Sequence, residues 1–209
     1  MNREQYRLYL VTDRTAAGFR PLEDIVAGAV RGGVSIVQLR EKTLCTRDFI
    51  EEARTLKKML SPLGIPLIIN DRVDVALASG ADGVHLGQSD MPYADARALL
   101  GPGKIIGLSV ENQDQVVLAN SLDVDYIGIS PVFGTPTKTD TANPFGLDGL
   151  EKAVRSSLHP CVAIGGINKS NAAAVMATGA DGIAVVSAIM GAASPESAAI
   201  ELYETVKVL

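Results

Sequence analysis

One short polar segment contains several of the residues that could take part in binding or catalysis. The sequence QLREK at residues 38–42 follows an apolar run and contains two cationic side chains. Because side chains of an extended chain alternate between two faces, Gln38, Arg40 and Lys42 are predicted to share one face. A buried guanidinium without a partner costs on the order of several kcal/mol, so we expect an anionic ligand beside Arg40. The alternative is an internal ion pair between Arg40 and a neighbouring aspartate.

Two aspartates follow the next two apolar runs. Asp71 comes after residues 67–69, and Asp90 comes shortly after residues 83–86. If adjacent strands carry them, two carboxylates meet near the cations, which favours a Mg²⁺ ion shared with substrate phosphates. The alternative is helix capping, since Asp71 precedes a helical stretch and Asp90 precedes Pro92, a residue favoured at helix starts.

Two later segments are suited to binding phosphate. Residues 131–146 lack an apolar period, and a connection of this length indicates a functional or lid segment, with a solvated loop as the alternative. Residues 165–166 are a Gly-Gly pair before a helix expected near Asn168, and Val186 and Ser187 end another apolar run. Glycines let a ligand approach the backbone closely, and N–H groups at helix starts attract phosphate.

These residues need a scaffold that brings them together. Short β-branched runs alternate with amphipathic stretches, such as 46–61 with Thr46 as its N-cap and 112–121, which predicts a parallel sheet. We expect a single-domain (β/α)8 barrel over residues 1–209, with its chemistry at the C-terminal ends of the strands. A doubly wound sheet is less favoured because no glycine-rich turn follows the first strand. The expected strands are residues 7–12, 35–40, 67–70, 83–86, 105–109, 126–130, 161–164 and 182–186.

Composition excludes several classes of protein. The net charge is −5, tryptophan is absent and no basic stripe offers a face to nucleic acid. No run approaches the about 20 apolar residues of a membrane span, and no signal-peptide pattern opens the chain, so we expect a cytoplasmic protein. Cys45 and Cys161 are expected to be packing residues rather than reactive thiols, and their positions give no argument for a disulfide. A homo-oligomer is compatible with the sequence, which does not determine the oligomeric state.

Taken in order, the motifs resemble one family over about residues 6 to 190. They are LYLVTD at 8–13, QLREK at 38–42, INDR at 69–72, GVHLGQ at 83–88, the 128–138 loop, AIGGI at 163–167 and VVS at 185–187. This combination is similar to the thiamine-phosphate synthases. The resemblance implies an enzyme of thiamine biosynthesis, a transferase that joins a pyrimidine diphosphate to a thiazole phosphate, or its carboxylated form, and releases pyrophosphate.

The resemblance also implies roles for individual residues. Arg40, Lys42 and Lys138 would be catalytic, because they would stabilise the leaving pyrophosphate together with Mg²⁺ bound by Asp71 and Asp90. The residues implied to hold the pyrimidine diphosphate are Gln38, Arg40, Lys42, Asn70, Ser109 and Lys138. Those implied to hold the thiazole phosphate are Thr135, Thr137, Gly166, Val186 and Ser187.

The expected chemistry is a dissociative substitution, in which an electron-rich aminopyrimidine stabilises the cation left by pyrophosphate. It needs charge stabilisation and alignment rather than a nucleophile. His85, inside a short strand, is interpreted as structural or supporting, and His159 as exposed. Two alternatives are a thiazole tautomerase-like paralogue, which needs no diphosphate site, and a non-enzymatic regulator that binds thiamine phosphate.

Overall fold

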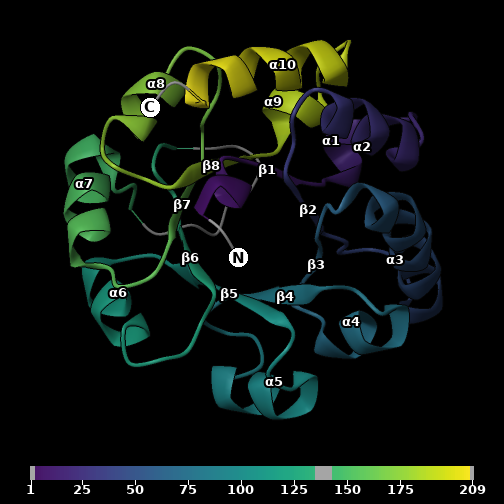
Figure 1. Cartoon of the computed structure of the whole chain (residues 1–209), viewed down its shortest axis with the longest axis horizontal. Helices are drawn as coiled ribbons and strands as arrows, with labels where there is room; N and C mark the ends of the chain where they lie inside the picture. The colour runs from purple at the N-terminus through teal and green to yellow at the C-terminus, as the bar shows by residue number, and fades with distance from the viewer. Residues whose placement is uncertain (1–2, 135–142, 208–209) are drawn as a thin grey trace.

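Eight parallel strands close into a barrel. In the computed structural model, which describes residues 3–134 and 143–207, each strand pairs with the next and β8 pairs with β1. Figure 1 shows the strands forming the central ring with helices around it. The expected (β/α)8 fold is confirmed. The strands are β1 (Leu8–Val11), β2 (Ile36–Leu39), β3 (Leu67–Asn70), β4 (Gly83–Leu86), β5 (Ile105–Val110), β6 (Tyr126–Ile129), β7 (Cys161–Ile164) and β8 (Gly182–Val185).

Helices follow the strands and cover the outside of the ring. The amphipathic stretches expected at 46–61 and 112–121 contain α3 and α6, and the Asn112 side chain caps α6 by accepting from the N–H of Gln115. The N-cap predicted at Thr46 is wrong: Cys45 takes that position, and Thr46 is the first helical residue. The helices are η1 (Arg3–Tyr6), α1 (Arg14–Ala17), α2 (Leu22–Arg31), α3 (Thr46–Leu60), η2 (Ser61–Leu63), α4 (Val73–Ser79), α5 (Tyr93–Leu100), α6 (Gln113–Ala119), α7 (Gly146–Ser156), α8 (Ala172–Met176), α9 (Ser187–Met190) and α10 (Pro195–Val206).

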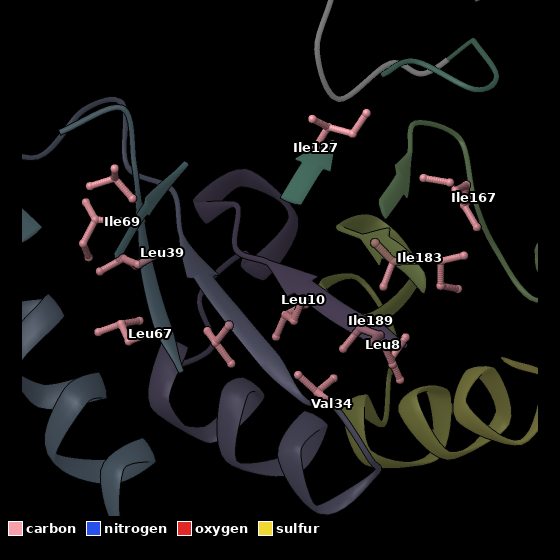
Figure 2. Close-up of a cluster of buried hydrophobic side chains, with 14 of the residues drawn as sticks. Leu8, Leu10, Val34, Leu39, Leu67, Ile69, Ile127, Ile167, Ile183 and Ile189 are labelled. Carbon is pink, nitrogen blue, oxygen red and sulfur yellow. The ribbon is translucent and has the colours of Figure 1, made fainter. Parts of the chain in front are cut away.

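Alternation along the strands separates two layers of packing. Leu8 and Leu10 belong to the large apolar layer between the strands and the helices, part of which Figure 2 shows. Tyr9 and Val11, between and after them, belong to a smaller cluster inside the barrel. The inner face therefore has room for polar side chains near the C-terminal ends of the strands, while the outer layer supplies most of the apolar burial.

The N-terminal end of the barrel is closed by η1. Tyr6 is buried there and donates a hydrogen bond from its hydroxyl to the Asp125 carbonyl at 3.0 Å. In Figure 1, the η1 coil lies over the centre of the strand ring. A Cβ added at Gly182 would lie 1.8 Å from the Tyr6 carbonyl oxygen, so only glycine permits this approach.

The variant Gly182→Ala is expected to lose roughly 3 kcal/mol of stability, because the clash is with backbone and must shift η1 or β8. For a chain of this size, that corresponds to a fall of roughly 6–12 °C in Tm. Differential scanning calorimetry measures it. Gly103→Ala is the control, since an added Cβ there meets no atom within 4 Å. Equal melting temperatures for the two variants would contradict the close approach.

Two other expectations concern burial and membranes. Cys161 is buried, and that burial raises the pKa of its thiol to about 11, but Cys45 is exposed, so the packing role predicted for Cys45 is wrong. Both cysteines are free. Within the described residues, no helix combines the length and the apolar character required to cross a bilayer.

Candidate active site

A cavity of about 820 Å³ lies inside the C-terminal end of the barrel. Every strand contributes to its lining, β3 through its last residue, Asn70, and the loops that follow the strands complete the walls. The predicted site residues among its lining are Gln38, Arg40, Lys42, Asn70, Asp71, Asp90, Ser109, Gly166, Val186 and Ser187. The structure therefore brings all the described candidates to one cavity. Thr135, Thr137 and Lys138 lie outside the described residues.

Arg40 faces this cavity with part of its charge already paired. Its Nη1 donates to Asp13 Oδ2 at 2.9 Å, and its backbone N–H donates to the Thr12 hydroxyl at 3.0 Å. Both charged side chains are mostly buried, at 22% and 14% exposed. Asp13 also caps α1 through its other oxygen. The internal ion pair considered as an alternative is thus present, and it fixes a guanidinium whose remaining edge lines the cavity.

Next to it, Lys42 and the two aspartates form a compact charged group. Lys42 Nζ donates to Asp71 Oδ2 at 2.5 Å. Burial raises the pKa of Asp90, and the neighbouring carboxyl of Asp71 raises it further. Asp71 has a left-handed backbone, with φ of 63°, which is rare outside glycine and uncommon even for aspartate. The chain therefore holds two carboxylates against each other at a cavity wall, an arrangement that a bound cation would relieve.

Helix capping does not account for these aspartates. Neither α4 nor α5 has a side-chain cap, and their N-cap positions are Arg72 and Pro92. Asp90 instead closes its own turn, where its Oδ2 accepts the N–H of Gly87 at 2.7 Å. The capping alternative is therefore wrong for both aspartates.

A chain of hydrogen bonds crosses the floor of the cavity. Gln38 Nε2 donates to the Tyr9 hydroxyl at 2.9 Å, and that hydroxyl is 2.8 Å from the hydroxyl of Tyr126. Tyr126 is 2.9 Å from Nδ1 of His85, whose Nε2 is 2.8 Å from the Ser109 hydroxyl. Gln38 is only 4% exposed. Its Nε2 is thus committed to the protein, whereas Arg40, on the same face, lies nearer the cavity mouth.

The opposite wall is built from backbone. β7 lies opposite β3 in the ring and is followed by Gly165 and Gly166, both with positive φ. A Cβ on Gly166 would lie 2.9 Å from the Gly134 carbonyl oxygen, so glycine is required where this turn meets the segment after β6. Val186 and Ser187 follow β8 beside it. The helix expected near Asn168 begins only at Ala172, because the Asn168 side chain closes a turn first: its Oδ1 accepts the N–H of Ser170 at 2.9 Å.

Three residues of the site had no assigned role in the sequence analysis. Asp13 stands in the first motif, but only the fold shows that it pairs with Arg40. Tyr9 and Tyr126 lie on interior-facing positions of apolar strands. Strand alternation could have placed both tyrosines inside the barrel, although nothing in the local sequence identifies their partners.

His159 is partly buried, with Nε2 3.0 Å from the Ala119 carbonyl, so its predicted exposure is wrong.

Known proteins of one family match this chain over nearly its whole length. A family model described as thiamine monophosphate synthase matches residues 8–189. A thiamine-phosphate synthase from Albidiferax ferrireducens is 58% identical over 200 residues, which cover 96% of this chain and 91% of the relative. Another, from Vibrio parahaemolyticus, is 56% identical over 194 residues, or 93% of this chain and 95% of the relative.

A solved structure gives the same agreement in three dimensions. The thiamine phosphate pyrophosphorylase from Pyrococcus furiosus superposes with a TM-score of 0.90 at 41% sequence identity. The match covers 99% of this chain and 98% of the other. Fold and sequence thus point to one family.

Proposed function

The chain belongs to the thiamine monophosphate synthase family, and from this membership we propose that its cavity joins a pyrimidine diphosphate to a thiazole phosphate. It is a transferase of thiamine biosynthesis. The observation that carries the proposal is the division of the cavity: cations and a carboxylate pair form one wall, and a glycine backbone turn forms the wall opposite. One wall suits a diphosphate, and the other suits a lone phosphate.

At the charged wall, Arg40 and Lys42 bind the diphosphate. Asp13 holds the Arg40 guanidinium in place, so less side-chain freedom is lost when an anion binds. A diphosphate would also take Lys42 from its contact with Asp71, since the Lys42 side chain is 54% exposed and flexible enough to turn into the cavity. Lys138 is proposed as a third cation from the segment after β6. Asn70 and Ser109 would contact the pyrimidine ring, with Gln38 behind them.

Asp71 and Asp90 fit a Mg²⁺ site. The fit rests on the two adjacent carboxylates, because Mg²⁺ is commonly bound by one or two carboxylates plus substrate phosphates and water. In the described part of the chain, no three histidine, cysteine, aspartate or glutamate side chains form a metal cluster. Most ligands would therefore come from the diphosphate and water. When bound, the ion would supply positive charge to the leaving group.

The thiazole phosphate is assigned to the opposite wall. Backbone groups of Gly166 and Val186 and the hydroxyl of Ser187 would hold it, together with Thr135 and Thr137. Such backbone sites bind phosphate without a cation, so the two anionic groups are kept apart by the width of the barrel. With the phosphates bound in this way, we expect the thiazole nitrogen to lie between them and to face the pyrimidine methylene.

The reaction then needs little acid–base chemistry. The methylene C–O bond breaks, and its electron pair leaves with the diphosphate oxygen, where Arg40, Lys42 and Lys138 stabilise the charge. The lone pair of the thiazole nitrogen forms the new C–N bond. The protein contributes alignment of two bound substrates and stabilisation of one leaving group.

The whole chain is proposed to act as a single catalytic domain in the cytoplasm. Both substrates are multiply charged phosphate esters, which do not cross a lipid bilayer unaided. The two free thiols, Cys45 and Cys161, are consistent with a reducing compartment.

The test is a pyrophosphate-release assay on the full chain with Mg²⁺, using both substrates together and each alone. We expect pyrophosphate and thiamine phosphate in equal amounts, only when both substrates are present. Isomerisation of the thiazole without use of the pyrimidine would indicate a tautomerase. Binding of thiamine phosphate without any pyrophosphate release would indicate a regulator. Either of these results refutes the proposal.

A further inference from the structure

The buried hydrogen-bond chain under the cavity has a direction. Gln38 Nε2 is an amide nitrogen, which can donate a hydrogen bond but cannot accept one, so it donates to the Tyr9 hydroxyl. That hydroxyl has one hydrogen of its own, which is left for its other contact, Tyr126, at 2.8 Å. Only one hydrogen can lie between two phenol oxygens at this distance. The Tyr126 hydroxyl thus accepts from Tyr9 and must turn its own hydrogen toward Nδ1 of His85.

The two phenols keep their hydrogens across the ordinary pH range. Burial raises the pKa of Tyr9 and of Tyr126 well above that of a free phenol. Both side chains are at most 1% exposed, so water does not compete for their hydrogen bonds. The donors and acceptors along the chain are therefore fixed in number, and the orientation of one end determines the other.

At the far end, this direction sets the chemistry of Ser109. A histidine whose Nδ1 accepts a hydrogen bond carries its hydrogen on Nε2, and here Nε2 faces the Ser109 hydroxyl at 2.8 Å. Ser109 then accepts from His85, and its own hydrogen remains free to turn into the cavity that it lines. The ring of His85 is also held in place by stacking on Tyr126, with centroids 5.5 Å apart.

We propose that Gln38, Tyr9 and Tyr126 hold His85 as the neutral Nε2–H tautomer, so that Ser109 is presented to substrate as a hydrogen-bond donor. The three residues and His85 are positioning residues, because they act through Ser109. A donor at this point recognises an unprotonated ring nitrogen, and it rejects a ring that offers an N–H there. The statement that Ser109 recognises a ring nitrogen of the substrate rests on the proposed function. The direction of the hydrogen-bond chain does not.

The direction can be measured on the wild-type chain without substrate. The protein has two histidines, His85 and His159. In ¹⁵N-labelled full-length protein, long-range ¹H–¹⁵N NMR spectra identify which ring nitrogen carries hydrogen, and His159→Gln assigns the two sets of signals. We expect His85 to carry hydrogen on Nε2 alone. Any hydrogen on Nδ1 means that the hydrogen-bond chain runs in the other direction or ends before His85. That result overturns the proposal.

Two variants test whether the tautomer depends on the chain. Tyr126→Phe removes the donor to Nδ1, and Tyr9→Phe removes a hydroxyl that makes no contact with His85. Both should give a mixture of His85 tautomers and leave the His159 signals unchanged. Both should also lower kcat/KM for the pyrimidine diphosphate about tenfold, the effect of roughly one hydrogen bond, without changing KM for the thiazole phosphate.

Tyr6→Phe is the matched control. Tyr6 is an equally buried phenol that packs on the Tyr126 ring with centroids 5.3 Å apart, but its hydroxyl donates to the Asp125 carbonyl and lies outside the chain. It should leave the His85 tautomer and kcat/KM unchanged. A Tyr9→Phe variant that keeps a single His85 tautomer contradicts the proposal. Because the spectra need no substrate, an absence of pyrophosphate release would refute the proposed function and leave this result standing.

Discussion

Replacing Asp90 with asparagine is expected to lower kcat/KM for pyrophosphate release by roughly 100- to 1000-fold, the range found when one preorganised electrostatic stabiliser is removed. The loss follows because asparagine keeps the shape of the side chain and can still accept the N–H of Gly87, but removes one of the two charges proposed for Mg²⁺. The Mg²⁺ concentration giving half-maximal rate should rise accordingly. A Mg²⁺ titration of pyrophosphate release measures both effects.

The same variant should not destabilise the ligand-free protein. Burial and Asp71 raise the pKa of Asp90 in the folded chain above its unfolded value. Such a group favours folding below the unfolded pKa, and this contribution is lost as pH rises through the folded pKa. At neutral pH, the ionised Asp90 therefore opposes folding, so Asp90→Asn should melt at the wild-type temperature or above it.

The control for this variant is Asp74→Asn. Asp74 lies three residues from Asp71, but it is 60% exposed, pairs with Arg72 and lies outside the cavity. Its rate and Mg²⁺ dependence should stay at wild-type values. An Asp90→Asn enzyme with the wild-type Mg²⁺ requirement would rule out Asp90 as a ligand.

Replacing Arg40 with alanine is expected to have an effect of similar size, roughly 100- to 1000-fold on kcat/KM for the pyrimidine diphosphate. The change removes a fixed cation from the diphosphate wall and also leaves Asp13, which is 14% exposed, without its ion-pair partner. An unpaired carboxylate so close to an incoming anion adds repulsion. Arg40→Lys keeps the charge but loses the planar fork, so it should lie between alanine and wild type.

Arg97→Ala separates the loss of an ion pair from the loss of the site. Arg97 is 20% exposed, close to the 22% of Arg40, and pairs with Asp125, yet it does not line the cavity. This variant should lower Tm while its kcat/KM stays near wild type. Steady-state pyrophosphate release and calorimetry on all three variants give the comparison. Equal rates for Arg40→Ala and Arg97→Ala would argue against binding of the diphosphate at Arg40.

The amino-acid pattern alone was enough to predict the strands, their two faces and the position of the charged residues. Six of the eight expected strands begin at the residue where the structure begins them, and the other two begin one residue later. This success has a local cause: the alternation of apolar and polar residues depends on the backbone period of two, which each segment carries within itself. The same period predicted one face for Gln38, Arg40 and Lys42, and the order of the strands put Asp71 and Asp90 after two neighbouring strands.

Which of these groups contact one another could not be read from the sequence and is known from the folded chain. Arg40 pairs with Asp13, 27 residues away, and Lys42 with Asp71, 29 residues away. Tyr9 and Tyr126 share a hydrogen bond across 117 residues. Pairing of β1 with β2 and of β2 with β3 brings the two ion pairs together, whereas Tyr9 on β1 and Tyr126 on β6 meet only because the sheet closes into a barrel. Ion pairing and hydrogen-bond direction depend on distances between side chains that are far apart in the sequence. The local alternation of residues carries no information about those distances.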